Sequence, residues 1–233
     1  MQEKARNVMP KTKAIIDDGF NPELVETAFF DGVLEMPRIE APEKIVIPSG
    51  MIPFSVRNSS KDHSEHIVFY EHDVNFADVL KNPQKYVKEL SGFAGVVTLD
   101  CSLYRDMPLI AQMMNVYRSR AIGHFFQKNG LYVIPNVRWG DERSYTTCCL
   151  PEKFAFLGIP KNSIVSIGTY GCIRNREDKF YFKSGLIEML SELEPEIVLV
   201  YGSMPDSIFA DLRDKTHFVN YPDWISLKKA KRS

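Results

Sequence analysis

The sequence has little cysteine, no long apolar run and almost no net charge, and each absence excludes a class of protein. Four cysteines in 233 residues are too few for a disulfide scaffold in a chain of this size. No run approaches the roughly 20 apolar residues that cross a bilayer, and the start MQEKARNVMPKTK lacks the apolar segment of a signal peptide. The formal net charge of -1 provides no global attraction for nucleic acid or anionic lipid. We therefore expect a cytoplasmic protein that does not bind membranes.

Familiar cofactor motifs are also missing. The chain contains no G-x-G-x-x-G fingerprint, no P-loop and no C-x-x-C pair, so no cofactor is indicated and the cofactor stays unknown. The cysteines lie in or just after expected strand ends, so reduced thiols and a shared metal site both stay open. No residue is assigned as a metal ligand. The cysteines are Cys101, Cys148, Cys149 and Cys172.

What is present is a regular alternation of apolar runs and helical segments. Near-continuous Val, Ile and Leu runs are typical of strands buried on both faces of a parallel sheet. The sequence therefore predicts an α/β fold with a mostly parallel sheet. The expected strands are 67–71, 95–100, 131–137, 163–168, 196–202 and 217–220. The expected helices between them are 76–90, 107–128, 151–157, 180–195 and 206–215.

The domain organisation follows from the same pattern. We expect one core over 44–225, an N-terminal extension over 1–43 and a basic tail over 226–233. A helix is predicted over 23–34, with Asn21 as its cap and Pro22 in its first turn. An open sheet and a closed barrel share one local pattern, but polar residues after most strands favour a TIM-barrel-like fold. A complete barrel needs about 250 residues, so we expect a compact or incomplete one.

One polar residue stands out at a strand end. The carboxyl ends of parallel strands share one face, where such folds bind ligands. Asp100 directly follows the apolar run GVVTL, where low-dielectric surroundings can raise the pKa of its carboxyl and suit a catalytic base or nucleophile. A carboxylate after a strand can equally cap the next helix. Both interpretations stay open.

In the segment VIPNVRWGDERS at 133–144, an apolar strand is followed directly by several charged residues and a tryptophan. Arginines there can clamp an anion, and aromatic rings there and in the turn GTYGC at 168–172 can stack on a flat group. The same charges can instead satisfy one another as a structural ion-pair cluster. The candidate ligand-binding residues are Arg138, Trp139, Arg143 and Tyr170, and the candidate catalytic carboxylates beside Asp100 are Asp141 and Glu142.

Five motifs together resemble a known family. They are LDCSLYRDMPL at 99–109, NVYRSRAIG at 115–123, VIPNVRWGDERS, GTYGC and LVYG at 199–202. Their combination resembles an uncharacterised domain-of-unknown-function family found in phages, prophages and mobile elements. The resemblance implies one domain and a phage-type setting, with no established activity to carry over. Membership of these motifs keeps Asn115, Tyr117, Arg118 and Arg120 as site candidates, although a helix rising 1.5 Å per residue carries Arg118 away from the strand ends. Arg105, in the first motif, is a further ligand-binding candidate.

These patterns lead to two functional hypotheses. The first is a phage-type enzyme with a nucleotide-like or other anionic ligand site, catalysing glycosyl transfer or hydrolysis on a nucleotide, nucleoside or nucleic-acid end. One carboxylate can stabilise an oxocarbenium-like centre while another handles the proton. The alternative is a non-catalytic binder that sequesters a host signalling nucleotide or a host protein. A nucleic-acid-binding accessory protein is disfavoured by the net charge, and the oligomeric state is not indicated.

Overall fold

The computed structural model describes residues 21–230, and parallel strands that follow one another in sequence order form their centre. Two hydrogen-bonded sheets, β3-β4-β5-β6 and β7-β8-β9, are parallel throughout. A parallel bridge between Asn136 and Ser166 joins the end of the first sheet to the second. The parallel α/β prediction is therefore confirmed. The strands are β3 (Met51–Pro53), β4 (His66–Val68), β5 (Gly95–Val97), β6 (Val133–Ile134), β7 (Ile164–Gly168), β8 (Ile197–Tyr201) and β9 (His217–Tyr221).

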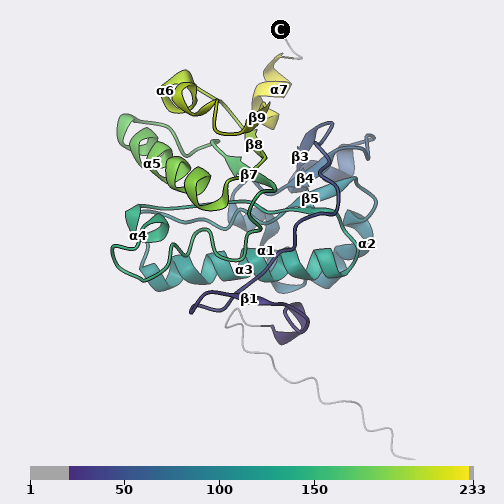
Figure 1. The fold of residues 1–233 in the computed structure, drawn as a ribbon. Coiled ribbons are helices and arrows are strands. Elements are labelled where there is room, and N and C mark those ends of the chain that lie inside the picture. The colour runs from purple at the N-terminus through teal and green to yellow at the C-terminus, as the bar shows by residue number, and fades with distance from the viewer. Residues whose placement is uncertain (1–20, 231–233) are drawn as a thin grey trace, which may run out of the picture.

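Helices pack on one face of these strands. The two long ones are α3 (Leu109–Lys128) and α5 (Arg176–Leu193), and Figure 1 shows them beside the first and the second sheet respectively. Asn175 caps α5 by accepting a hydrogen bond from a backbone N–H of its first turn. After α3 the chain turns at Gly130, whose φ of 82° is a left-handed conformation that glycine adopts without a Cβ clash.

The opposite face of the strands carries no helix from residues 21–230 and is nevertheless buried. Val68, Val97, Ile134, Ile164 and Leu199 are each 0% exposed and belong to one hydrophobic cluster. Apart from two loop residues, the members of this cluster come from β3 to β9 and the residues that directly follow them. Because no helix covers this face, the strands must shield one another's side chains, which requires the sheet to curl.

The first and last strands approach each other. The hydroxyl of Tyr221, at the end of β9, donates a hydrogen bond to the carbonyl oxygen of Pro48, just before β3, at 2.6 Å. Within residues 21–230 no backbone ladder pairs β9 with β3. The described strands therefore form a curled array whose edges touch through a side chain.

The helix predicted over 23–34 is wrong. Asn21 does cap a helical turn, but this is a 3-10 turn, η1 (Pro22–Leu24), and the chain then forms a hairpin of β1 (Phe30–Asp31) and β2 (Met36–Pro37). Gly32 turns the hairpin at φ 66°. The next amide, Val33 N–H, donates to both carboxylate oxygens of Glu152 at 3.0 and 2.9 Å. These tertiary bonds and the contact of β2 with α3 replace the helical bonds that the local pattern favoured.

Two further expected helices differ from the structure. Residues 151–157 form turns: the Ala155 N–H donates to the carbonyl oxygen of Ser144 rather than to that of Pro151, and the carbonyl oxygens of Ala155 and Leu157 accept from the guanidinium of Arg120. The stretch 76–90 is broken at Pro83, which has no N–H to donate. Its pieces are η3 (Asp73–Phe76), α1 (Ala77–Lys81), η4 (Pro83–Lys85) and α2 (Val87–Leu90).

The remaining elements are short. Part of the predicted basic tail forms the last helix, α7, which buries no residue, and residues 231–233 and 1–20 lie outside the described range. No helix within 21–230 is long and apolar enough to cross a membrane. The remaining elements are η2 (Phe54–Ser59), α4 (Glu142–Tyr145), α6 (Asp206–Phe209), η5 (Ala210–Leu212) and α7 (Trp224–Ala230).

Candidate functional site

Two cavities lie side by side at the carboxyl ends of the strands. The smaller cavity has a volume of about 320 Å³ and the larger one about 480 Å³. Both volumes fall in the range of small-molecule sites, about 300–1,000 Å³. The two cavities share a wall formed by Tyr104, Arg138, Gly171 and Cys172.

Asp100 lines the smaller cavity three residues after β5. Its two carboxylate oxygens are held separately: Oδ1 accepts from Asn136 Nδ2 at 2.8 Å, and Oδ2 accepts from Arg138 Nη1 at 3.2 Å. Both partners come from the segment after β6, on the neighbouring strand. Burial raises the pKa of the Asp100 carboxyl, while Arg138 and Asn136 oppose that rise. The carboxylate is thus oriented and partly shielded from water.

A chain of hydrogen bonds orients Asn136. The Tyr70 hydroxyl, two residues after β4, donates to Asn136 Oδ1 at 3.0 Å and lies 2.7 Å from the Ser166 hydroxyl on β7. Because Tyr70 uses its proton for Asn136, Ser166 must donate to Tyr70, and the amide nitrogen of Asn136 must face Asp100. Residues on or just after β4, β6 and β7 therefore fix the position of the carboxylate that follows β5.

The shared wall joins Arg138 to a thiol. Arg138 Nη1 lies 3.0 Å from Cys172 Sγ, and the same thiol donates to the carbonyl oxygen of Tyr170 at 3.3 Å. Burial raises the pKa of the Cys172 thiol, although Arg138 opposes the rise. The thiol is therefore protonated at neutral pH and donates within the turn 168–172.

The smaller cavity has hydrogen-bond donors without protein partners. The indole Nε1 of Trp224 is buried and has no acceptor among residues 21–230, and Arg174 has no ion-pair partner in the same range. Tyr170 is 47% exposed at the same cavity. The carboxylates of Glu71 and Asp223 are already bonded to neighbouring donors. The groups that this cavity can still offer to a ligand are therefore mainly hydrogen-bond donors and an aromatic ring.

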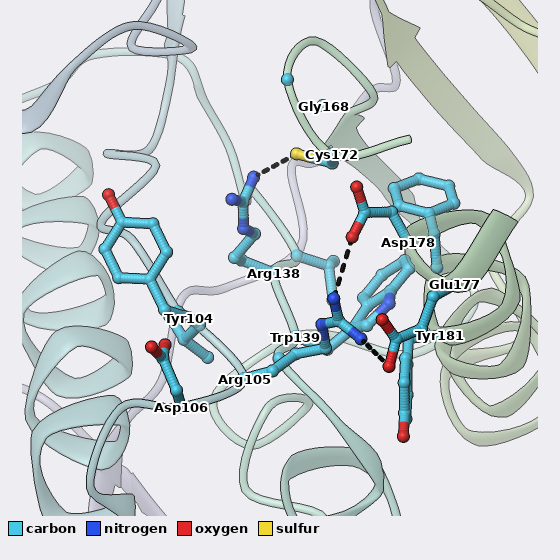
Figure 2. A pocket seen from close by; sticks show the side chains of 15 residues that line it. Tyr104, Arg105, Asp106, Arg138, Trp139, Gly168, Cys172, Glu177, Asp178 and Tyr181 are labelled. Atoms are coloured by element: carbon cyan, nitrogen blue, oxygen red, sulfur yellow. Dashed lines mark hydrogen bonds and ion pairs between the residues drawn. The ribbon is translucent and has the colours of Figure 1, made fainter. Parts of the chain in front are cut away.

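The larger cavity is lined differently, as Figure 2 shows. Arg105 pairs with Glu177 and Asp178 at 3.0 Å each, and its guanidinium lies 4.8 Å from the centre of the Tyr181 ring. Trp139 is only 7% exposed and packs against Phe182 with ring centres 5.2 Å apart. This wall is therefore acidic and aromatic, with one arginine held inside it.

The structure separates the predicted site residues into two groups. Asp100, Arg105, Arg138, Trp139 and Tyr170 line the cavities. The others lie outside both of them. Asp141 caps α4 and pairs with Arg143 at 2.8 Å, Glu142 is exposed, Asn115 donates to the carbonyl oxygen of Ser102 at 2.7 Å, and Arg118 is half-buried on α3.

Sequence reasoning missed Tyr70 and Trp224. Tyr70 lies two residues beyond Val68, so the alternation of a strand places it on the same inner face, and this signal was available. Trp224 follows the last strand at the start of α7, and its position over the cavity has no signature in the sequence.

The four cysteines do not converge. Cys101 is buried, Cys148 and Cys149 are exposed, and Cys172 is intermediate, all as free thiols. Within residues 21–230 no three His, Cys, Asp or Glu side chains are arranged to hold a metal ion. A shared metal site of the four cysteines is therefore not formed.

Parallel strands, helices on the outer face and paired polar cavities at the strand ends define the class: an α/β protein with its cavities where such folds place their sites. Residues 28–222 match the family model described as domain of unknown function, DUF4417. The chain belongs to this family, as the motifs predicted. It is similar to the Gene 1 protein of Mycobacterium phage D29, 32% identical over 136 residues, and to that of Mycobacterium phage L5, 30% identical over 162 residues.

These matches are partial. The D29 match covers 58% of this chain and 48% of the phage protein, so the chain spans about half of that relative. The L5 match covers 68% of each. No solved structure matches. The relatives confirm the expected phage connection and their names specify no activity.

Proposed function

We propose that the smaller cavity binds a flat, anionic ligand of the nucleotide type. The observation that carries this proposal is a set of donors beside exposed aromatic surface: the buried Trp224 N–H and Arg174, next to Tyr170, neither of which has an acceptor or ion-pair partner within the described part of the chain. A buried donor without an acceptor is costly, by about 1–3 kcal/mol. A ligand that supplies phosphate or carbonyl oxygens removes that cost and gains a charge-assisted bond from the arginine.

The chemistry that fits this cavity is glycosyl transfer or hydrolysis on a nucleotide, nucleoside or nucleic-acid end. Asp100 is the carboxylate that would face the sugar, stabilising positive charge at the anomeric carbon or attacking it. Asn136 and Arg138 hold its two oxygens in fixed directions, so little reorganisation is needed when charge develops. Asp141 and Glu142 lie outside the cavity, so a second proton-handling group would come from the ligand, water or another lining residue.

The curled array of strands supports a finer proposal about the fold. Sequential parallel strands, helices on one face and a buried inner face are the features of a TIM-like barrel. We propose an incomplete barrel whose gap lies between β9 and β3, bridged by the bond of Tyr221 to Pro48. The phage relatives support a working location in the host cytoplasm.

Non-catalytic binding is the second candidate. One observation favours it: both oxygens of Asp100 are already engaged by Asn136 and Arg138, which is also how a purely structural carboxylate is held. In this case the cavity would sequester a host signalling nucleotide, and a host protein would be a further partner to test.

The two tryptophans make a direct test practical. The full-length protein labelled with ¹⁵N has two indole N–H signals, and Trp224→Phe identifies the one at the smaller cavity. Adenosine 5′-monophosphate, adenosine and inorganic phosphate are titrated separately. We expect the nucleotide to shift the Trp224 signal, and Arg174→Met to weaken binding about tenfold, because a charge-assisted bond contributes about 1.5–3 kcal/mol.

A second measurement separates enzyme from binder. The bound nucleotide, nucleoside or oligonucleotide is recovered after incubation and analysed by mass spectrometry. Conversion that Asp100→Asn abolishes while binding persists supports the enzyme. Tight binding with recovery of unaltered compound across the panel contradicts the enzyme and leaves the binder. Absence of binding by every phosphate compound contradicts both.

A further inference from the structure

We propose that the larger cavity binds a second substrate, an organic amine or guanidine compound, which accepts the group transferred from the ligand in the smaller cavity. The inference rests on the proposed function and makes the reaction a transfer between two bound molecules rather than a hydrolysis. Its basis is the junction of two cavities of unlike chemistry at one wall beside Asp100.

The junction determines how two ligands can meet. Arg138 and Cys172 line both cavities, and Arg138 also contacts Asp100, which lines only the smaller one. A compound in the larger cavity therefore lies against Arg138, the residue that contacts Asp100 from the shared wall. The larger cavity, about 480 Å³, exceeds what a single water nucleophile would need and is of small-molecule size.

Charge determines the class of the second ligand. The lining of the larger cavity contains three carboxylates, from Asp106, Glu177 and Asp178, and two guanidiniums, from Arg105 and Arg138. Arg138 is already matched by Asp100, and Arg105 pairs with Glu177 and Asp178, so the carboxylates of this lining outnumber the guanidiniums and Asp106 is left over. Asp106 is exposed and has no ion-pair partner among residues 21–230. An anionic ligand is disfavoured here, and a cationic one is attracted.

The chain itself shows which group this wall can hold. The guanidinium of Arg105 lies against Tyr181 between Glu177 and Asp178, as the labelled side chains in Figure 2 show. A planar cation is thus accepted by two carboxylates and one aromatic face, which is the pattern by which proteins recognise cationic ligands. The remaining carboxylate, Asp106, offers a second contact for a cation on the other side of the cavity.

The transfer step balances with the residues present. The bound cation first gives one proton to water, and its nitrogen, now neutral, forms a bond to the anomeric carbon of the first ligand. The glycosidic bond breaks, and its electron pair goes to the leaving group. Asp100 takes the proton lost by the attacking nitrogen and returns it to the leaving group, so the carboxylate is regenerated. No oxidant, reductant or metal is required.

The test uses benzylamine, which combines an ammonium group with a flat ring, and the same ¹⁵N-labelled full-length protein. Trp139 lines the larger cavity and Trp224 the smaller one, so each indole signal reports on one cavity. We expect benzylamine to shift the Trp139 signal, and Asp106→Lys to weaken its binding about fivefold to tenfold, as reversal of one exposed charge predicts. Asp214→Lys is the matched control, because Asp214 is exposed and lines neither cavity.

The outcomes are distinguishable. A shift of Trp139 that Asp106→Lys weakens and Asp214→Lys does not supports the second site. Nucleotide binding at Trp224 without any benzylamine effect at Trp139 overturns this inference and leaves the proposed function standing. A benzylamine effect that is equal in both variants assigns it to general charge and also overturns the inference. Failure of the nucleotide at Trp224 counts against the proposed function itself.

Discussion

Replacement of Arg120 by Met should destabilise the protein more than any surface charge change. Arg120 is 2% exposed and lies in the middle of α3. Its guanidinium donates three hydrogen bonds of 3.0 Å, to the carbonyl oxygens of Asn136, Ala155 and Leu157. These bonds tie α3 to the strand end that carries the site and to the turns at 151–157. Arg120→Met keeps much of the apolar stem and removes all three donors.

The magnitude follows from two opposing contributions. Hydrogen bonds from a charged donor contribute roughly 1.5–3 kcal/mol each, so three contribute roughly 4.5–9 kcal/mol. Burial acts against the cation, since it lowers the pKa of Arg120 from 12.5 to about 10, which corresponds to roughly 3 kcal/mol. The net loss expected for Arg120→Met is therefore about 2–6 kcal/mol in the free energy of unfolding.

Urea unfolding followed by tryptophan fluorescence measures this loss. Arg213→Met is the control, because Arg213 pairs with Asp206 at 2.6 Å while both side chains are more than half exposed, and such pairs contribute at most about 1 kcal/mol. Arg120→Lys should lie between wild type and Arg120→Met, since one ammonium cannot reach three carbonyls in a planar fork. A midpoint for Arg120→Met within the range of the control, at unchanged m-value, would refute the reasoning.

Three further predictions concern titration and reactivity. His66 is 1% exposed with neither ring nitrogen bonded among residues 21–230, and burial lowers its pKa from 6.5 to about 4. Since the unfolded chain binds the proton first, stability should fall by up to about 3 kcal/mol as pH drops from 6.5 to 4, and His66→Leu should flatten that drop in urea titrations. Tyr70→Phe should raise the pKa of Asp100 further in a ¹³C carboxyl NMR titration, because Asn136 loses its fixed orientation. An unchanged value would show that the amide is held by other contacts. Cys148 is exposed, whereas Cys101 is buried with a raised thiol pKa. Mass spectrometry should therefore show that iodoacetamide labels Cys101 at least about a hundredfold more slowly than Cys148 in the folded protein. Equal rates would contradict the packing described.

Strand positions were predictable because buried parallel strands leave a local signature. The runs after residue 95 lie where the strands β5 to β9 are found, and the helix over 107–128 differs from α3 only at its start. The errors came where long-range bonds replaced local ones. Residues 23–34 form a hairpin whose turn amide binds Glu152, more than 100 residues away, and no local pattern encodes such a partner.

The candidate site was predictable only in part. Asp100 and Arg138 follow adjacent strands, so the rule that parallel strand ends share one face brought them together, and they are found 3.2 Å apart. Asp141 and Glu142 are only three and four residues beyond Arg138, yet they turn away from the cavities. Asp141 caps α4 and binds Arg143, because a short helix begins there and its amides need an acceptor.

The sequence alone determined the α/β class, the parallel strands, the family and the end of the molecule where the polar residues gather, since these depend on local periodicity and on motifs. The tertiary structure decided the rest. Within VIPNVRWGDERS, residues 137–140 line the cavities, whereas Asp141 caps α4 and pairs with Arg143. Tyr70 and Trp224, which are far apart in the sequence, complete the smaller cavity. Which donors find partners, and which remain for a ligand, depends on the curling of the sheet, because only that curl brings the first and last strands to one opening.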